Sequence, residues 1–363
     1  MFKLNIIQAE FGDSFILEFG TPSDPHYVLI DGGPEMVYEK HLKSVLKGIK
    51  QAGYDLDLVV LSHDDDDHVV GLKDYFAELR LANHGLPLPK GLWYNSFAGT
   101  IGQGNDIETR IRSLITATRA NVMSNSGVML QGIADGIELR RAALALQIPI
   151  NEYFVDELIS LDTVPQTLHF ANADFLIVGP TKATLNDLRQ KWADWLDEHE
   201  NAIVSDDIYV MANSDRTIPN RSSIMILVKA DNKTILLTGD GRSDHLLEGL
   251  GQANLLNDAG CLHVDVLKLP HHGSERNVTK AFFKKVTADT YIISANGKDD
   301  NPDMAMLIWI AEAAKSQKRK INIIATNRTE STQRLLREYP KEKYRYTMDD
   351  ISLRNKDCKI ITI

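Results

Sequence analysis

The stretch Leu58-Val59-Val60-Leu61-Ser62-His63-Asp64-Asp65-Asp66-Asp67-His68 joins an apolar run to two histidines that bracket four carboxylates. Adjacent carboxylates repel one another, and a divalent cation among them removes that repulsion. His63 and Asp65 are two positions apart, so in an extended segment both point to one side, while Asp64 and Asp66 point away and hold the turn. Asp67 and His68 then turn toward a second point nearby. The stretch therefore predicts a site for two metal ions at the end of a buried strand.

The acidic run also fits a solvated surface, because runs of like charge are usually exposed. A calcium loop of the EF-hand type has Asp at alternate positions too, but it requires Gly at its sixth position and Glu at its twelfth. Counted from Asp64, these positions hold Val69 and Tyr75, which excludes the calcium loop. The histidine at each end and the apolar strand before the run favour the metal site over the solvated surface.

Length and composition are those of an ordinary globular chain. It has 363 residues, 43% of them apolar and 25% charged, and we take residues 1–363 as a single domain. The two cysteines, Cys261 and Cys358, form neither a disulfide framework nor a zinc knuckle, so a reducing cytoplasm is expected. No apolar run reaches 18 residues, so no membrane span is expected. The net charge of -10 argues against a general nucleic-acid coat.

Apolar periodicity and turn residues divide the chain into strands and helices. Strands are expected at 3–9, 14–19, 27–30, 56–61, 92–95, 169–177, 222–229, 234–237, 264–269, 291–294, 321–325 and 359–363, and helices at 37–52, 72–81, 184–199, 244–250, 279–287, 304–315 and 332–339. The helix between the strands that end at Ile30 and Leu61 implies that these strands pair in parallel. Ligands collect beyond the C-terminal ends of such strands.

Residues 99–162 differ from the rest of the chain. They contain few strand signals, and helices are expected at 107–120 and 136–145, with Gly, Asn and Ser between them. We interpret this segment as a helical insertion within the domain. It either roofs the site or forms a helical layer that does not touch it.

Metal-type side chains follow the ends of three predicted strands. They are His63 to His68, Asp240 after strand 234–237, and His271-His272 after strand 264–269. Carboxylate and imidazole ligands together suit Zn, Mn or Fe and disfavour an all-oxygen Mg or Ca site. Asp31 follows a fourth strand and precedes a glycine pair, whose tight turn would hold it near the site.

These motifs together resemble a known family. His63-x-Asp65-x-Asp67-His68 is similar to the His-x-His-x-Asp-His signature of the metallo-β-lactamase fold, with Asp in place of the second His. The likeness is greatest to the hydrolase-like domain of ComEC-type competence proteins and their soluble relatives. It runs from Met1 to about Ala295, and residues 99–162 lie outside it. Three further motifs carry it, namely Asp31-Gly32-Gly33, Leu237-Thr238-Gly239-Asp240 and Leu267-Lys268-Leu269-Pro270-His271-His272-Gly273-Ser274.

The resemblance implies an α/β (α+β) fold, a four-layer αββα sandwich with a two-metal site at one edge. His63 and Asp65 would hold one Zn or Mn ion and Asp67 and His68 the other. Asp240 would bridge the two ions, His271 would complete the set, and Asp31 would orient a ligand imidazole. His272 is the alternative ligand, or a contact to the substrate. The wider fold has one more His before the bridging Asp, where this chain has Asn220-Arg221-Ser222-Ser223, so one metal would be weakly held or would be manganese.

Two cations about 3.5 to 4 Å apart lower the pKa of a bridging water and clamp the oxygens of an in-line displacement. We therefore expect a metal-dependent hydrolase, a phosphodiesterase or nuclease acting on a phosphate-containing substrate such as a nucleic acid or nucleotide. Asp67 or Asp240 would orient the hydroxide, and His272 would protonate the leaving oxygen. The expected substrate contacts are Asn220, Arg221, Ser222, Lys268, Ser274 and Arg276, whose cations would neutralise the remaining charge.

Two alternatives stay open. The same site could hydrolyse a non-phosphate ester, a thioester or a lactam, because the hydroxide itself does not select phosphorus. The chain could instead be a metal-stabilised component of a multi-protein system that binds a protein partner through residues 99–162 and has little or no turnover.

Overall fold

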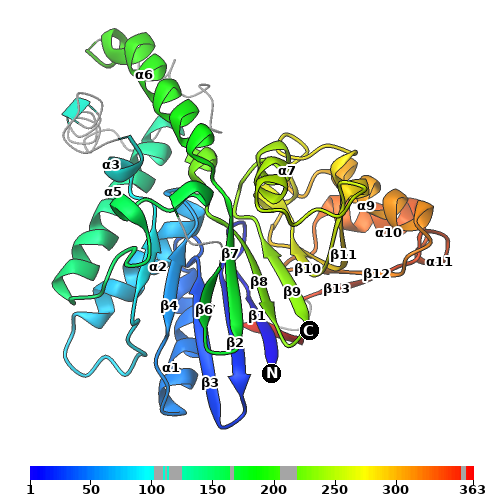
Figure 1. Cartoon of the computed structure of the whole chain (residues 1–363), viewed down its shortest axis with the longest axis horizontal. Coiled ribbons are helices and arrows are strands. Elements are labelled where there is room, and N and C mark those ends of the chain that lie inside the picture. Colours follow the sequence, from blue (N-terminus) through cyan, green and yellow to red (C-terminus); the bar gives the residue numbers. More distant parts are fainter. Residues whose placement is uncertain (102–108, 111–112, 114–124, 164–166, 205–218, 353–356) are drawn as a thin grey trace.

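The computed structural model describes residues 1–101, 109–110, 113, 125–163, 167–204, 219–352 and 357–363. Within them the chain forms two mixed sheets, with helices against the outer face of each (Figure 1). The mixed α/β class expected from the sequence is confirmed. The helix expected at 107–120 lies, apart from residues 109–110 and 113, outside the described part of the chain.

The first sheet has the strand order β14-β1-β2-β3-β4-β5. Strands β14, β1, β2 and β3 pair in antiparallel, whereas β3, β4 and β5 are parallel, as the helix between β3 and β4 requires. The bounds are β1 (Phe2–Ile7), β2 (Phe15–Thr21), β3 (Asp24–Ile30), β4 (Leu58–Leu61), β5 (Leu92–Tyr94) and β14 (Cys358–Thr362).

The second sheet has the strand order β13-β12-β11-β10-β9-β8-β7-β6. Strands β9 to β13 are parallel, and β6 to β9 are antiparallel. The bounds are β6 (Leu168–Phe170), β7 (Ala173–Gly179), β8 (Met225–Ala230), β9 (Lys233–Leu237), β10 (Leu262–Lys268), β11 (Val286–Ile293), β12 (Ile321–Ala325) and β13 (Tyr346–Asp350).

Helices cover the outer face of each sheet. Helices α1, α2 and α5 lie against the first sheet and α7 to α10 against the second, while α6 projects from the upper edge in Figure 1. The bounds are α1 (Lys43–Gln51), α2 (Asp66–Leu79), α3 (Phe97–Ile101), α5 (Asn125–Ala145), α6 (Lys182–Val204), α7 (Ser243–Gln252), α8 (Phe282–Lys285), α9 (Met304–Ser316), α10 (Glu330–Glu338) and α11 (Lys341–Tyr344). In the described residues, no helix combines the length and apolar composition needed to cross a membrane.

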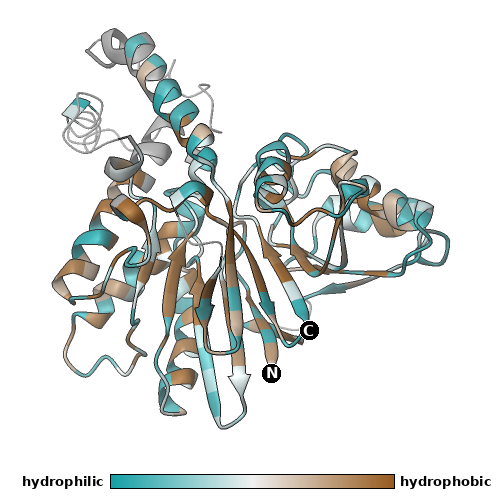
Figure 2. Cartoon of the chain, viewed as in Figure 1, coloured by the Kyte–Doolittle hydropathy of each residue, from teal (hydrophilic) through white to brown (hydrophobic). Residues whose placement is uncertain are grey.

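Alternation along the strands explains how the layers hold together. In β4, Leu58 and Val60 face the other sheet, and Val59 and Leu61 face the helices. Both faces of the strand are therefore buried, which is why the stretch is continuously apolar. Three apolar cores result, one between the sheets and one under each helical layer, and Figure 2 shows the strands as the most hydrophobic part of the chain.

Two expected helices have the wrong bounds, the strand expected at 169–177 is the antiparallel hairpin of β6 and β7, and one strand was not expected. The acid run is not extended throughout, because α2 begins at Asp66 rather than at Leu72, and Asp66 and Asp67 stabilise the positive end of its dipole. The helix expected at 279–287 ends at Lys285, since Val286 already starts strand β11 between two parallel neighbours. Strand β13 is an addition to the expected strands, and it pairs only at the sheet edge.

A close backbone contact fixes α2 against the end of β3. A Cβ atom at Gly71 would overlap the carbonyl oxygen of Gly32, and one at Gly32 would overlap the backbone of Gly71 and Leu72. The amide of Gly32 also donates to the carbonyl of His68 at 2.8 Å. The two glycines therefore set how closely the acid run approaches Asp31.

Gly71→Ala is expected to lower the free energy of unfolding by about 1–3 kcal/mol, the usual cost of overpacking. Gly48→Ala in α1 is the matched control, because a Cβ there meets nothing within 4 Å. That change should raise stability by about 0.5–1 kcal/mol through helix propensity. Urea unfolding of both variants measures the difference, and equal effects would contradict the close contact.

Candidate metal centre

The polar cluster lies where strands of both sheets end. Asp31 follows β3, Ser62 and His63 follow β4, and Asp240 follows β9. His271 and His272 follow β10, in a tight turn where both residues adopt positive φ. The carboxyl ends of parallel strands thus bring residues from positions 31 to 272 to one edge of the molecule, as the order of strands and polar residues in the sequence predicts.

Buried ring nitrogens converge on Asp240. His68 Nε2 lies 3.4 Å from Asp240 Oδ1, and His272 Nε2 lies 3.3 Å from Asp240 Oδ2. His63 Nε2 lies 3.9 Å from the same Oδ2 and 3.4 Å from Asp65 Oδ2. The three Nε2 atoms and Asp240 Oδ1 are buried without a hydrogen-bond partner. Unpaired buried polar atoms are costly, so this set is one that a bound cation would satisfy.

The donors form two overlapping groups. Atoms of His63, His68 and Asp240 lie within 4.8 Å of one another, and so do atoms of Asp67, His68 and His272. His272 Nε2 is 3.1 Å from Asp67 Oδ2. Of the predicted ligands, the structure thus brings together His63, Asp67, His68 and Asp240. Asp65 lies at the edge of the group, where it contacts His63 alone of these residues.

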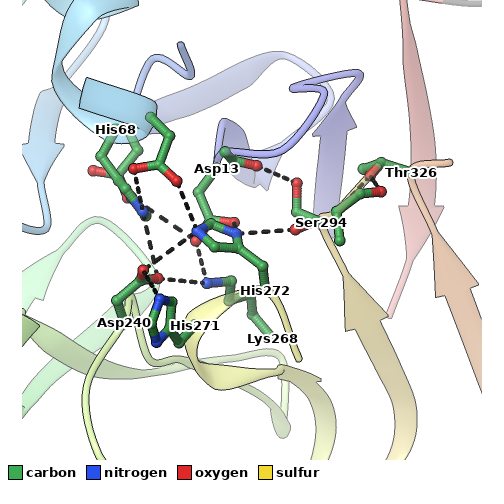
Figure 3. Close-up of polar contacts among 12 residues, drawn as sticks. Asp13, His68, Asp240, Lys268, His271, His272, Ser294 and Thr326 are labelled. Carbon is green, nitrogen blue, oxygen red and sulfur yellow. Dashed lines mark hydrogen bonds and ion pairs between the residues drawn. The ribbon is translucent and has the colours of Figure 1, made fainter. Parts of the chain in front are cut away.

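The two adjacent histidines, between which the sequence left the choice of ligand open, differ in position. His272, expected as the alternative ligand or as a proton donor, is 4% exposed and its Nδ1 is 2.9 Å from the carbonyl oxygen of Ser294, which turns Nε2 toward the group (Figure 3). His271, expected as the ligand, is a quarter exposed. Its Nδ1 lies 2.7 Å from Asn277 Oδ1 and its Nε2 3.7 Å from Asp240 Oδ2. The cause is the turn after Pro270, which directs the second imidazole inward.

Asp31 holds the imidazole of His68. Its Oδ2 is 2.9 Å from His68 Nδ1, and it also accepts the hydroxyl of Ser62 at 2.8 Å. Its Oδ1 accepts the amide of Ser62 at 2.7 Å. This leaves His68 Nε2 to face Asp240, which is the orienting position expected for Asp31 from the sequence.

Asp13 is part of the cluster, and sequence reasoning missed it. It lies in the turn between β1 and β2, is 1% exposed, and its Oδ1 is 3.6 Å from His272 Nδ1. Its other oxygen forms an ion pair with Lys268. A Cβ at Gly12 would overlap the carbonyl of Asp67, so the turn packs directly on the acid run. A lone Asp in a hairpin turn is usually solvated, so the sequence does not indicate that Asp13 is buried in the cluster. Only the long-range packing of the turn on the acid run shows this.

Lys268 lies beneath the cluster and not in the cleft. It is 1% exposed, donates to the carbonyl of Gly239 at 2.9 Å, and lies 3.5 Å from Asp240 Oδ1. The expected contact of Lys268 with a substrate is therefore corrected, because this ammonium is enclosed by Asp13 and Asp240 (Figure 3).

Mutual attraction keeps these buried groups charged. Burial by itself would raise the carboxyl pKa values, but His272, His68, His271 and Lys268 hold the pKa of Asp240 well below its ordinary value. Burial would lower the pKa of His68, but Asp240, Asp31 and Asp67 raise it well above its ordinary value. A metal ion held by these imidazoles would therefore have to displace protons from them.

Asp64 and Asp66 have separate surroundings. Asp64 turns away from the cluster toward α5, where a Cβ at Gly136 would lie 2.5 Å from its Oδ1, and burial raises its pKa well above the ordinary value. Asp66, expected to point away, instead lines the main cleft, and burial together with Asp65, Asp135 and Asp67 raises its pKa to about 7. Its place in the first turn of α2 explains the difference.

Two cavities open at the cluster. The larger, about 700 Å³, is lined by Asp65, Asp67, Asp240 and His271 together with residues of α2 and α5. The smaller, about 200 Å³, is lined by Asp67, His271, His272, Ser274 and Arg276 among others. Gln131 and Asp135 of α5 line the larger cavity, so this helix of the predicted insertion forms a wall of the cleft.

The remaining predicted substrate contacts are dispersed. Arg221 pairs with Asp187 of α6, and Ser222 borders a separate small cavity with Asp64. Asn220 is 1% exposed and lies beside His271, with Nδ2 3.5 Å from Nδ1. Ser274 and Arg276 border the smaller cavity. Lys298, which sequence reasoning did not single out, lines both cavities.

No protein-family model matches this sequence, and no curated protein matches it.

Lys268→Met is expected to lower the free energy of unfolding of metal-free protein by about 3–5 kcal/mol, because it leaves Asp13 and Asp240 buried without their ammonium partner. Lys233→Met is the matched control, since Lys233 pairs with Asp265 at 2.8 Å on the surface. Its loss should be much smaller. Urea unfolding after dialysis against a chelator compares the two, and similar losses would show that Lys268 is not the compensating charge.

The two histidines should differ in metal retention. His272→Ala is expected to remove one equivalent of Mn or Zn per chain, because its Nε2 belongs to the inner group. His271→Ala should keep the stoichiometry and change affinity by about tenfold at most, as is typical of a supporting residue. Elemental analysis after equilibrium dialysis distinguishes them, and the reverse result would restore the assignment made from the sequence.

Proposed function

We propose that the protein is a divalent-metal-dependent phosphodiesterase built on a metallo-β-lactamase-type αββα sandwich. The layer order supports this fold, since an apolar core joins the two sheets and another lies under each helical layer. The position of the cluster supports it too, because the donors follow the C-terminal ends of β3, β4, β9 and β10 at one edge.

The observation that carries the proposal is the set of unpartnered atoms around Asp240. The Nε2 atoms of His63, His68 and His272 are buried and have no hydrogen-bond partner. Each Nδ1, by contrast, lies within hydrogen-bond distance of an oxygen, with Ser62 beside His63, Asp31 beside His68 and Ser294 beside His272. Histidines that bind a metal through one ring nitrogen typically have the other ring nitrogen hydrogen-bonded in this way.

Charge balance favours two cations over one. The cluster contains five carboxylates, and the single ammonium of Lys268 compensates one of them. With the imidazoles neutral, four negative charges remain, which matches two divalent ions. Uncompensated charge in and beside a buried site is unfavourable, which supports two ions rather than one. The five carboxylates are Asp13, Asp31, Asp65, Asp67 and Asp240.

The residues divide between two positions that share Asp240. His63 and Asp65 would hold one ion, and Asp67, His68 and His272 the other. Mixed carboxylate and imidazole donors suit Zn or Mn. Two bound metal ions would supply positive charge that lowers the pKa of water and offsets the negative charge developing on the phosphate oxygens.

The chain itself provides orientation and proton transfer. Asp67 and Asp240 line the larger cavity, where a carboxylate oxygen can accept a hydrogen bond from attacking water. His271 lines both cavities and keeps Nε2 directed toward Asp240, so it is placed to protonate a leaving oxygen. Lys298 and Arg276 replace Lys268 and Arg221 as the cations that can face a phosphate.

His68→Ala and Asp240→Ala are each expected to abolish hydrolysis of bis(p-nitrophenyl) phosphate by Mn- or Zn-loaded protein, a loss of at least about a thousandfold. His263→Ala is the matched control, because His263 is an exposed histidine of β10 bonded to Thr287. Turnover that survives both site changes would overturn the proposal.

A parallel panel with a carboxylic ester, a thioester and a β-lactam addresses the competing chemistry. Faster turnover on any of these than on the diester would replace the phosphodiesterase assignment. Full metal loading with no turnover on the whole panel would favour a binding role for the protein.

A further inference from the structure

The two cavities meet at the candidate metal centre. Asp67, His271, Phe11 and Lys298 border both of them, and the larger has more than three times the volume of the smaller. Asp240, which is 2% exposed and whose Oδ1 has no hydrogen-bond partner, lines the larger cavity. A phosphodiester centred on the metal donors would therefore direct one arm into each cavity.

The larger cavity is strongly acidic. Its lining includes eight carboxylates against two lysines, and only Asp65, Asp67 and Asp240 of the eight belong to the proposed metal ligands. The rest lie mainly toward α2 and α5. We define the acidic wall as Glu35, Asp66, Asp74 and Asp135.

The two lysines neutralise only part of this wall. Lys73 pairs with Asp135 at 3.2 Å, and Lys298 lies over the ring of Phe11, 3.5 Å from its centroid. Among the described residues no ion pair involves Glu35, Asp66 or Asp74. Burial raises the pKa of Asp74 against the attraction of Lys73, and repulsion by Asp135, Glu39 and Glu35 raises it further.

A strand of nucleic acid fits this cleft poorly. Proteins that bind nucleic acid neutralise successive phosphates with Lys and Arg, whereas phosphates flanking the reacting one would face the acidic wall here. Like charges brought together in an interface cost several kcal/mol. A positive group on the larger arm would instead be attracted by the ionised carboxylates of the wall.

Resting on the proposed function, we propose that the substrate is a small phosphodiester whose larger arm carries an amine or quaternary ammonium group. The phosphate lies at the metal donors, the ammonium lies against the acidic wall, and the smaller arm enters the cavity bordered by Ser274 and Arg276. Hydrolysis joins water oxygen to phosphorus and breaks the ester bond to the leaving alcohol, which takes the proton. No further reactant is needed.

Two p-nitrophenyl diesters test the charge preference at nearly constant shape. One is p-nitrophenyl phosphorylcholine, and the other is its uncharged isostere with a 3,3-dimethylbutyl arm. We expect kcat/KM for the choline ester to exceed that for the isostere by about tenfold, the effect of one moderately screened charge interaction. Added salt should reduce this ratio. A single-stranded oligodeoxynucleotide should be the poorest substrate.

Asp74→Asn and Asp135→Asn should each lower the ratio of kcat/KM between the choline ester and its isostere by about threefold or more. The two variants are independent, so the salt dependence and either variant suffice if the other does not fold. Glu248→Gln on the exposed side of α7 is the matched control, and it should leave the ratio unchanged.

The outcomes separate the two proposals. Absence of hydrolysis for all three substrates would overturn the phosphodiesterase assignment and this inference with it. Hydrolysis with a ratio at or below one, or with the oligonucleotide as the best substrate, would overturn only the ammonium arm. A ratio near ten that falls in both variants, but not in Glu248→Gln, is the expected result.

Discussion

The central constraint on this structure is that several carboxylates lie close together in its interior, where water does not screen their charges. Asp13, Asp31 and Asp240 are each at most 2% exposed, and such a set is tolerated only where opposite charge is equally close. Lys268 and the imidazoles of His68 and His272 provide that charge in the protein alone. The local folds follow from this requirement. Strand ends supply the donors, tight turns at Gly32 and Pro270 orient them, and the apolar cores of both sheets offset the cost of enclosing them.

The sequence is informative wherever a signal is local. The apolar run Leu58–Leu61 ends at the metal-type residues, and the repeated order of strand followed by polar residue is enough to predict that Asp31, His63 and Asp240 meet at one edge. The mixed α/β class follows from the same alternation. Strand β11 is harder to predict because Val286 and Thr287 continue an apparent helix, and only pairing with β10 and β12 makes them a strand.

Long-range packing is what sequence patterns do not supply. Asp13 joins the cluster because the β1–β2 turn rests on the carbonyl of Asp67, a contact between residues more than fifty positions apart. The choice between His271 and His272 depends on two consecutive positive φ angles after Pro270. Tertiary packing also decides which basic side chains can reach a substrate. Lys268 forms a buried ion pair, Arg221 pairs with Asp187 of α6, and Lys298 lines the cleft. Residue type and spacing predict neither the burial of Asp13, nor the choice between His271 and His272, nor the positions of the basic side chains.

The donors come from both sheets, and this division has a consequence for assembly. His63 and His68 belong to the first sheet and its helix, whereas Asp240 and His272 belong to the second. Neither half holds all the donors, so an ion that used donors from both halves would bind only after they have docked. An ion that binds the docked form alone would act as a clasp between them, and its free concentration would set how often they part. Removal of the ion by a chelator would then first weaken the contact between the two sheets at this edge, while each sheet stays folded.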